Sequence, residues 1–411
     1  MRHIRNIIIG AGQAGLAMSH CLTALSQPHV VLERGVVGNS WARERWDSLR
    51  LLTPNWQSRL PGHVYSGSDP DGFMTARSVV EYLAQYANAS AAPVQTGVTV
   101  TSVSRDANGY IVATNKGIWR AANVVLASGA CNRASVPSFA DDLPQHIVQV
   151  SPLSYHNPTD LPKGGVLVVG ASATGVQLAA EIHASGRPVI LAAGNHIRMP
   201  RHYRGHDIQW WMEHAGLLSA TADTVDDIAR ARSVPSLQLV GDPARQFLDL
   251  NALQNMGIEI VGRLAGMHDT SLMFSGALAN AASLSDLKMN RALTQMDNWV
   301  ATTGLDLKAP PVRFAPTWLP TLPRLTLDIS CGAIKTVVWA TGFAPDYSWL
   351  HLPVFDAKGR LVHNGGIVAP GLYALGLPFM RTRKSSLIDG VGDDARWLAR
   401  HIATSVDRRA A

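Results

Sequence analysis

The order of hydrophobic and polar positions at the start of the chain predicts a strand, a turn and a helix in direct succession. Residues 5–9 (RNIII) end in consecutive isoleucines, a pattern typical of a strand that is buried on both faces. A glycine-rich stretch follows at 10–15, then a helical pattern over 16–25, and a second apolar strand at 29–32. Together these segments predict a strand–helix–strand unit of the kind found in parallel sheets.

The turn between the first strand and its helix reads GAGQAG, which is the GxGxxG pattern of dinucleotide-binding folds. Gly10 permits the tight turn, Gly12 lets the backbone approach a pyrophosphate, and Gly15 lets the helix pack closely on the strand. The second strand ends on Glu33, where an acid can bind a ribose hydroxyl. We therefore expect this unit to hold a dinucleotide through the following residues: Gly10, Gly12, Gln13, Ala14, Gly15, Glu33 and Arg34.

A second unit of the same kind begins near residue 163. Residues 165–169 predict a buried strand, 170–175 read GASATG, and a helix through 182 precedes another strand at 188–191. Ser172 replaces the middle glycine; it is small enough to admit a phosphate and adds a hydroxyl donor. The nucleotide contacts expected here are Gly170, Ser172, Thr174 and Gly175.

The second strand of this unit ends without an acid. Residues 192–194 read AAG, and His196, Arg198, Arg201 and Arg204 follow. The missing acid and the nearby arginines suit a 2′-phosphate, so the pattern favours NADPH over NADH. Arg198 is the first candidate for the phosphate contact and Arg204 is a further one. A solvated basic loop is the alternative interpretation.

Two further apolar strands each end in two small residues and a glycine. They cover 124–129 (VVLASG) and 336–342 (TVVWATG), one before the second nucleotide unit and one after it. This order indicates an FAD domain interrupted by an inserted NADPH domain. We expect an α/β fold of two Rossmann-like three-layer domains, with FAD bound by 1–162 and 324–411. The NADPH domain then covers 163–323 and includes a helical insertion on the substrate side. The contacts expected at the two strand ends are Ala127, Ser128, Gly129, Thr341 and Gly342.

The composition and charge are typical of a globular enzyme with a large hydrophobic core. Of the 411 residues, 46% are hydrophobic and 16% charged; the net charge is +6, yet no continuous basic stripe suggests nucleic-acid binding. Cys21, Cys131 and Cys331 lie far apart, so neither a zinc site nor a dithiol relay is expected. No long apolar run is free of glycine or charge, so we expect no membrane span and a cytoplasmic location.

The order of the motifs resembles the two-dinucleotide-fold flavoproteins. GxGxxG with Glu33, ASG at 127–129, GxSxxG at 170–175 and ATG at 340–342 are most similar to flavin-containing monooxygenases and their bacterial relatives, over nearly the whole chain. The resemblance implies FAD and NADPH as cofactors, and dioxygen and a small molecule as substrates. It implies a flavin C4a-hydroperoxide that oxygenates a nitrogen, sulfur or ketone group. A homodimer is compatible with it.

The chain departs from the family's fingerprint between the two folds. That fingerprint places a histidine four residues before an aromatic residue, but Ser151 stands there before Tyr155, and His146 and His156 are out of step. Two other functions therefore stay open. One is an NADPH-dependent flavin reductase or oxidase that inserts no oxygen, and the other is a non-catalytic redox sensor. The lack of a cysteine pair disfavours a disulfide reductase.

The resemblance also assigns residues around the flavin. The segment from Gly38 through residue 56 is similar to the family stretch that runs along the pyrophosphate and the isoalloxazine ring. Asn55 is the candidate catalytic residue by this resemblance, with a purely structural loop as the alternative. The other cofactor contacts expected around the ring and the adenine edge are Ser40, Trp41, Arg45, Thr53 and Val100.

Near the C-terminus, a strand and turn at 370–376 precede a basic stretch and a long helix. We expect the N-terminus of this helix, at Asp389 and Gly390, to face the flavin pyrimidine and stabilise negative charge there. Residues 205–330 are less informative. The aromatic helix near 207–212 is expected in the core, and the Pro-rich run at 309–323 is expected to return the chain to the FAD domain.

Overall fold

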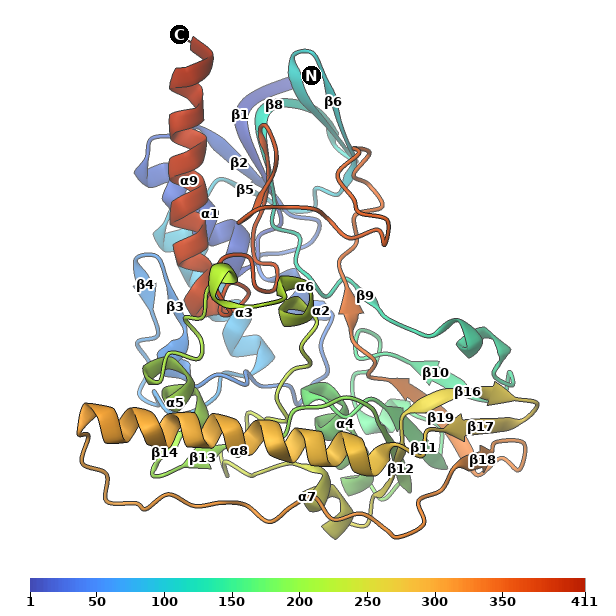
Figure 1. Cartoon of the computed structure of the whole chain (residues 1–411). Coiled ribbons are helices and arrows are strands. Elements are labelled where there is room, and N and C mark those ends of the chain that lie inside the picture. The colour runs from blue at the N-terminus through green and yellow to red at the C-terminus, as the bar shows by residue number, and fades with distance from the viewer. Residues whose placement is uncertain (411) are drawn as a thin grey trace.

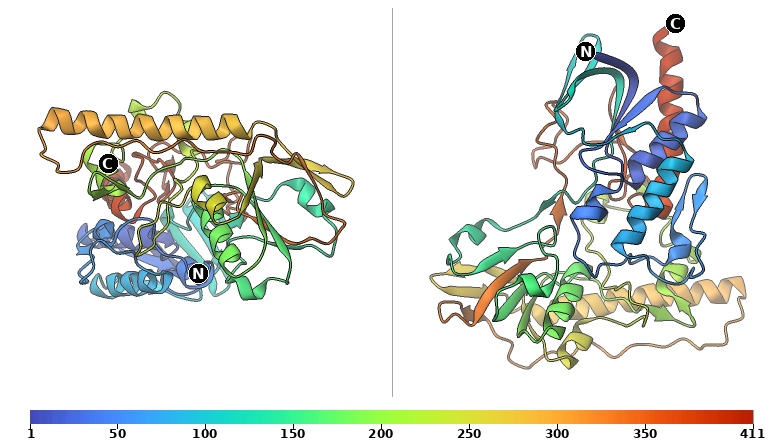
Figure 2. Two further views of the ribbon diagram at one scale, coloured as in Figure 1. Left: turned by 90° about the horizontal axis from the view of Figure 1, so that it is seen from below. Right: turned by 180° about the vertical axis from the view of Figure 1, so that it is seen from behind.

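Two α/β parts are stacked on one another in the computed structural model, which describes the backbone of residues 1–410 and the side chains of residues 1–404. One part carries both chain ends and lies uppermost in Figure 1. A long helix, α8 (Leu278–Thr303), runs along the base of the lower part (Figures 1 and 2). No helix in the described part of the chain is both long enough and apolar enough to cross a bilayer.

The upper part is built on an eight-stranded sheet with a parallel centre. Its order is β21-β22-β8-β1-β2-β5, and β6 and β7 form a hairpin that extends it from β8. Its strands are β1 (Arg2–Ile9), β2 (His29–Leu32), β5 (Val94–Gln95), β6 (Val100–Asp106), β7 (Gly109–Thr114), β8 (Gly117–Leu126), β21 (Ile367–Ala369) and β22 (Leu372–Ala374). Ile7 and Ile8 are fully buried, because α1 (Gln13–Ala24), α3 (Ala76–Ala89) and α9 (Ile388–Ala410) share one core with the sheet.

The lower part is built on a five-stranded parallel sheet of order β10-β19-β11-β12-β15. Its strands are β10 (Val148–Val150), β11 (Gly165–Val169), β12 (Val189–Ala193), β15 (Glu259–Gly262) and β19 (Ile334–Trp339). The helix α4 (Ala173–Ala184) packs on β11 and β12. A three-stranded antiparallel sheet of β16 (Leu264–His268), β17 (Ser271–Phe274) and β18 (Thr326–Asp328) completes this part.

The strand pairing corrects the expected domain boundaries. The sequence pattern places 148–150 and 334–339 in the FAD domain, but both strands hydrogen-bond into the lower sheet. The Pro-rich run at 309–323 likewise leads to β18 of the lower part, not to the upper sheet. An apolar strand that ends in a small-small-glycine turn can join either parallel sheet, so its sequence does not say which one it enters.

Two short antiparallel strands carry the chain between the parts. β9 (Arg133–Ala134) leads out of the upper sheet after β8, β20 (Phe343–Ala344) leads back after β19, and the two pair with each other. The remaining elements lie in the connecting segments: α2 (Asn39–Arg43), β3 (Arg59–Leu60), β4 (His63–Val64), β13 (His202–Tyr203), β14 (His206–Asp207), α5 (Ile208–His214), α6 (Ile228–Arg232) and α7 (Leu250–Asn255).

The segment before α8 forms a core of its own with that helix. Trp211 on α5 is fully buried, and Met289, Leu293 and Met296 of α8 belong to the same cluster. The expectation that the aromatic helix near 207–212 serves the core is therefore confirmed.

Candidate functional site

The first glycine-rich turn joins β1 to α1 in a backbone shape that glycine adopts readily. Gly10 has φ +108°, and a Cβ there would lie 2.4 Å from the carbonyl oxygen of Ala127. A Cβ on Gly15 would lie 1.8 Å from the carbonyl oxygen of Gly10, whereas nothing lies within 4 Å of one on Gly12. The turn is therefore closed around Gly10 and Gly15 and open at Gly12, where a pyrophosphate needs access.

The N-termini of α1 and α4 both leave backbone donors free for an anion. No side chain caps either helix, and neither first turn holds an acidic residue. Gln13 and Ala14 stand in the first turn of α1; Thr174 stands in that of α4, and Ser172 is its N-cap residue. Each helix has 12 residues, so its dipole adds positive potential at this end. Both ends fit a pyrophosphate.

Glu33 closes the end of β2 beside the first turn. Its side chain is buried; Oε2 accepts a hydrogen bond from the backbone N–H of Ala11 (2.8 Å), and Oε1 accepts one from Gly35 (2.9 Å). Two backbone donors thus hold the carboxylate in place, and each oxygen keeps a lone pair for a ribose hydroxyl. The neighbouring Arg34 is ion-paired with Glu44.

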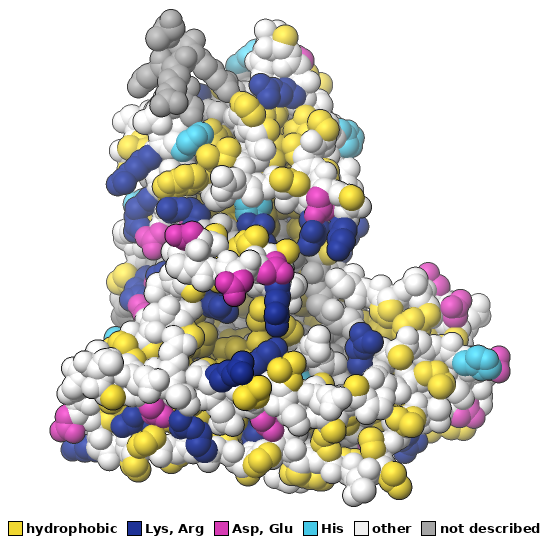
Figure 3. Space-filling view, viewed as in Figure 1, with side chains coloured by type: hydrophobic (Ala, Val, Ile, Leu, Met, Phe, Trp, Pro, Cys, Tyr) yellow, Lys and Arg dark blue, Asp and Glu magenta, His cyan; other side chains and the backbone are white. Residues whose placement is uncertain are grey.

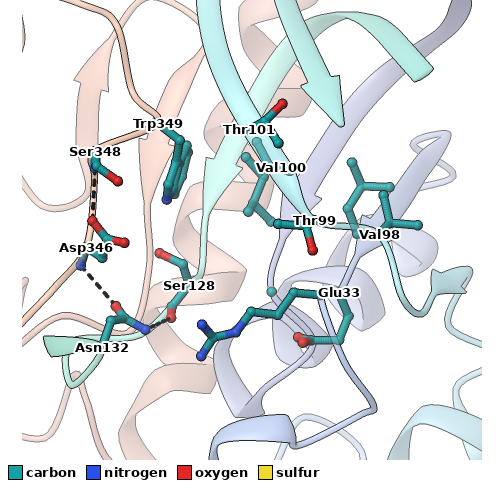
Figure 4. A pocket seen from close by; sticks show the side chains of 14 residues that line it. Glu33, Val98, Thr99, Val100, Thr101, Ser128, Asn132, Asp346, Ser348 and Trp349 are labelled. Atoms are coloured by element: carbon teal, nitrogen blue, oxygen red, sulfur yellow. Dashed lines mark hydrogen bonds between the residues drawn. The ribbon is translucent and has the colours of Figure 1, made fainter. Parts of the chain in front are cut away.

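A cavity of about 400 Å³ opens beside this turn, at the edge of the upper sheet. Its lining includes Glu33, Val98–Thr101, Ser128 and Trp349, and Figure 4 shows Trp349 and Ser128 across the cavity from Glu33. Val100, which the resemblance predicts to lie at an adenine edge, lines this cavity. A carboxylate, an aromatic ring and exposed strand backbone suit the adenosine half of a dinucleotide. We call this space the adenosine cavity.

The ASG turn after β8 forms one wall of the adenosine cavity. Ala127 supplies the carbonyl that meets Gly10, and Gly129 has φ +89°. The Oγ of Ser128 is buried and has no hydrogen-bond partner in the described part of the chain. The carbonyl of Ser128 accepts a hydrogen bond from Asn132 Nδ2 (3.0 Å; Figure 4). A buried hydroxyl without a partner on a cavity wall fits a ligand contact.

The second glycine-rich turn repeats the geometry of the first. Gly170 has φ +114°, and a Cβ there would lie 2.3 Å from the carbonyl oxygen of Ala340. A Cβ on Gly175 would lie 1.7 Å from the carbonyl oxygen of Gly170. The ATG turn is therefore packed against Gly170 as the ASG turn is against Gly10. This places Thr341 and Gly342 at the second nucleotide unit and corrects their assignment to the FAD domain.

A cavity of about 420 Å³ lies at the second turn. Its lining includes Gly170, Gly194, Thr341 and Arg263, the residue that follows β15. The Cγ of Arg263 lies 3.4 Å from the place of a Cβ on Gly194, so this side chain crosses the end of β12. Arg263 is exposed, and its guanidinium has neither a hydrogen bond nor an ion pair within residues 1–404. It is a free cation at the position where a strand–helix–strand unit holds the ribose.

Arg198 is a structural ion-pair centre, which corrects its assignment to the 2′-phosphate. The side chain is 4% exposed, Nε donates to Asp249 (2.7 Å), and Nη1 donates to Asp286 (2.7 Å) and to the carbonyl of Ala315 (2.8 Å). A buried guanidinium that serves two carboxylates is not available to a ligand. The sequence conceals this because both partners are distant along the chain.

The other two arginines of this segment are also paired. Arg204 donates to Asp297 (2.9 Å) and to the carbonyl of Ala309 (3.0 Å), which corrects its expected cofactor contact as well. Arg201 is fully buried and donates to Asp207 (2.8 Å). The arginines that follow β12 therefore stabilise the lower part of the molecule through ion pairs.

Trp41 and Arg45 lie at the junction of the two parts. Trp41 on α2 packs against the cores of both parts, and Ser40 precedes it on the same helix. The guanidinium of Arg45 lies 5.5 Å from the centre of the Trp41 ring, and burial lowers the pKa of this arginine. A cation held on an indole at the junction is suitably placed for the reactive end of a cofactor that starts in the adenosine cavity.

Asn55 anchors a loop, which corrects its catalytic assignment. It begins the short 3₁₀ helix Asn55–Gln57 and is buried. Its Oδ1 accepts from the backbone N–H of Met74 (2.7 Å), and its Nδ2 donates to the carbonyl of Asp69 (2.9 Å). Neither Asn55 nor Thr53 lines the adenosine cavity or the cavity at the second turn. Both ends of the Asn55 amide thus hold the protein's own backbone.

The start of α9 is engaged by neighbouring side chains. Asp389 accepts hydrogen bonds from Arg59 Nε (2.6 Å) and Lys384 Nζ (3.1 Å). A Cβ on Gly390 would lie 1.9 Å from the carbonyl oxygen of Lys384, so close packing requires this glycine. The Asp389 carboxylate thus neutralises two cations, and the role of this helix N-terminus at a flavin stays a prediction.

Several residues that line the two cavities escape prediction from the sequence, among them Asn132, Arg263, Asp346 and Trp349. None of these four belongs to a glycine motif, and three lie in segments that pass between the two sheets. A signal for Arg263 exists, because it follows an apolar strand in the way that Glu33 follows the strand at 29–32.

The comparisons with known proteins define the family. Residues 7–212 match the pyridine nucleotide-disulphide oxidoreductase family. That match covers half of the chain, so this protein belongs to the family. A CzcO-like oxidoreductase of Geobacillus kaustophilus is 32% identical over 98% of this chain and 99% of its own length.

More distant relatives carry monooxygenase names. A probable indole-3-pyruvate monooxygenase of Arabidopsis thaliana is 28% identical over 48% of this chain and 52% of its own. Among solved structures, the flavin-containing monooxygenase from Stenotrophomonas maltophilia superposes with a TM-score of 0.67 at 19% identity, over 99% of this chain and all of that chain. The structural likeness confirms the expected fold of two dinucleotide-binding domains.

Proposed function

We propose that this chain is an FAD-dependent, NADPH-consuming monooxygenase that binds FAD at the first glycine-rich turn and NADPH at the second. The repeated geometry carries the proposal. Each turn is closed by a carbonyl from a small-small-glycine strand end, and each opens beside a cavity, of about 400 and 420 Å³. The family match and the monooxygenase names of the relatives support oxygenation of a small nitrogen-, sulfur- or ketone-containing molecule.

The chain's own residues bind and orient the two nucleotides. FAD held there would supply the capacity to take up a hydride and to react with dioxygen. Glu33 receives the ribose hydroxyls of FAD, and the open N-terminus of α1 receives its pyrophosphate. Arg263 pairs with the 2′-phosphate of NADPH, a strong charge-assisted contact. The junction around Trp41 is where the two cofactors meet and where water must be excluded.

A second candidate is an NADPH-dependent flavin reductase or oxidase that inserts no oxygen. The observation that favours it is the altered segment between the folds, where Ser151 stands in place of the family's histidine. Tyr155 is fully buried, and its hydroxyl donates to Glu181 of α4 (3.1 Å). This segment is therefore fastened to the NADPH domain by a contact that needs no histidine.

Isotope-labelled turnover separates the two candidates. The purified flavoprotein is supplied with NADPH and heavy-isotope dioxygen, together with a panel of amines, sulfides and ketones. The proposal predicts one heavy oxygen atom in a product and NADPH consumption matched to it. If all electrons from NADPH appear in hydrogen peroxide with every compound of the panel, the result favours the reductase or oxidase. Absence of flavin from the purified protein contradicts both.

We also propose a cytoplasmic location. Cys21, Cys131 and Cys331 are all free thiols, which suits a reducing compartment. A homodimer stays a prediction, and sedimentation equilibrium of the purified protein tests it.

A further inference from the structure

A further cavity lies where the two parts of the molecule meet. Its volume is about 900 Å³, and its walls come from α6, the segment 343–348 that begins with β20, the loop 355–363 and Leu377–Pro378. Figure 3 shows Lys and Arg side chains along the boundary between the upper and lower parts, on the face that it draws. We call the cavity that these walls enclose the junction cavity.

The junction cavity adjoins the proposed FAD site. Ser348 lines both the junction cavity and the adenosine cavity. Leu377 follows Gly376, where a Cβ would lie 2.8 Å from the Cβ of Ala14 in the first glycine-rich turn. A molecule in the junction cavity therefore lies beside the path of the flavin nucleotide.

The charge of the junction cavity is strongly unbalanced. Four cationic side chains line it, against the single carboxylate of Asp356: Arg133, Arg232, Lys358 and Arg360. The carboxylate of Asp356 accepts a hydrogen bond from Arg360 Nε (2.8 Å). Within residues 1–404, the other three cations have no carboxylate partner, and Arg232 donates only to the carbonyl of Phe379 (3.2 Å).

The cations of this cavity also repel one another. Burial and the charge of Arg360 lower the pKa of Arg232. Burial and the charge of Arg232 lower the pKa of His363 to about 4, so this lining histidine is neutral near neutral pH. An anion between Arg232 and Arg360 would relieve this repulsion and supply the missing counter-charge.

The rest of the lining is apolar. Aromatic and aliphatic side chains cover the walls around the cations: Phe343, Tyr347, Phe355, Leu361, Val362 and Leu377. A small inorganic anion would leave this surface unused. The lining instead matches a molecule with a charged head and an apolar body.

We propose that the junction cavity is the substrate site and that the substrate is an apolar molecule carrying a carboxylate, which Arg232 holds with help from Arg360. That the bound molecule is the substrate rests on the proposed function, whereas the binding of a carboxylate rests on the charge and lining of the cavity alone. The diphosphate of FAD is the other anion within reach of these walls, and the test separates the two.

Calorimetry on the purified flavoprotein, without NADPH, measures binding apart from turnover. Phenylbutyrate and its neutral amide, phenylbutyramide, are the probes. We expect the carboxylate to bind about tenfold more tightly than the amide, because a charge-assisted contact to Arg232 is made only by the carboxylate. R232Q should remove this difference while the FAD content per protein stays unchanged.

Two further variants complete the test. R230Q alters an exposed arginine of the same helix that does not line the cavity, and it should bind both probes as the unaltered protein does. R360Q changes an exposed loop residue and should weaken carboxylate binding in the same direction as R232Q, which guards against misfolding of the α6 variant.

Three results would overturn the inference. Equal binding of the two probes would show that the cations do not select a carboxylate. Loss of FAD from R232Q at unchanged thermal stability would assign the cations to the cofactor. Unchanged probe binding in both R232Q and R360Q would place the anion elsewhere. By contrast, a flavoprotein that selects the carboxylate but inserts no oxygen overturns only the proposed function.

Discussion

Arg263 differs from its basic neighbours in having nothing within the described chain to neutralise it. Arg198, Arg201 and Arg204 each donate to a carboxylate of the lower part, whereas Arg263 lies exposed on a cavity wall at the second glycine-rich turn. An unpaired guanidinium at that place is suited to a phosphate that NADPH carries and NADH lacks.

Substitution of Arg263 should change the choice of nucleotide. We expect R263Q to raise the KM for NADPH about tenfold or more and to leave the KM for NADH nearly unchanged, since only the 2′-phosphate loses a contact. Steady-state reduction of the flavin by each nucleotide measures both values. R291Q, which alters an exposed arginine of α8, is the control. A parallel rise in both KM values would show that Arg263 does not recognise the phosphate.

At the residue scale, the glycines were easier to predict than the charged side chains. Gly10 and Gly170 are required by backbone geometry that the motif itself encodes. The partners of Arg198 and Asn55 lie in other segments, so a local pattern could not reveal that both side chains are already engaged. Their assignments as ligand and catalyst failed for that reason.

At the scale of elements, two substitutions in the turn between β1 and α1 should separate the effect on folding stability from the effect on FAD affinity. Gly10→Ala should lower the free energy of unfolding by about 2 kcal/mol or more, because its φ of +108° and a neighbour at 2.4 Å both oppose a Cβ. Gly12→Ala has open space around it and should cost less than about 0.5 kcal/mol, yet weaken FAD binding about tenfold. Urea unfolding and FAD fluorescence measure the two quantities. Equal losses of stability in the two variants would contradict the geometry.

Arg198 holds α7 and α8 together through Asp249 and Asp286. Arg198→Leu should lower the free energy of unfolding by about 3–5 kcal/mol, because it leaves two carboxylates unpaired at buried or nearly buried positions. Its remaining folded fraction should keep the preference for NADPH. Arg324→Leu, which breaks an exposed pair with Glu259 in the same part, should cost less than about 1 kcal/mol. A normally stable Arg198→Leu protein with lost NADPH preference would restore the discarded phosphate role.

The sequence predicts elements better than it predicts their partners. The strands at 29–32 and 165–169 and the helices after the two glycine turns are found where the periodicity places them. The sequence pattern places the strand at 334–339 in the wrong sheet, because strand pairing is decided by side-chain packing between distant segments. No local pattern encodes that packing.

At the scale of the whole molecule, buried and half-buried histidines contribute to the response to acid. Six have pKa values lowered chiefly by burial: His20, His29, His63, His196, His202 and His363. In the unfolded chain they titrate near 6.5, and His363 titrates at about 4 when folded. Between these values the unfolded chain binds more protons, so folding stability is complete above about pH 6.5 and falls as the pH drops toward 4.

Urea midpoints measured between pH 7.5 and pH 4.5 (about three units of pH) test this response. The midpoint should fall steadily on acidification, and His363→Asn should make the fall shallower. His268→Asn, which alters an exposed histidine, should follow the unaltered protein. A midpoint that stays constant over this range would contradict the account of burial.

The junction cavity belongs to this largest scale as well. Arg133, Arg232 and Arg360 come from three segments that meet only in the folded chain. The motifs predict two nucleotide folds, but they do not predict what the space between those folds binds, since loops far apart in sequence build its walls.

Anaerobic titration of the purified flavoprotein with NADPH tests the central claim most directly. Two dinucleotide folds that meet at one junction should let about one equivalent of NADPH bleach the visible absorbance of about one bound flavin, a stoichiometry set by two-electron hydride transfer. NADH should do so far less efficiently. A protein that carries no flavin, or a bound flavin that NADPH leaves oxidised, would contradict the account.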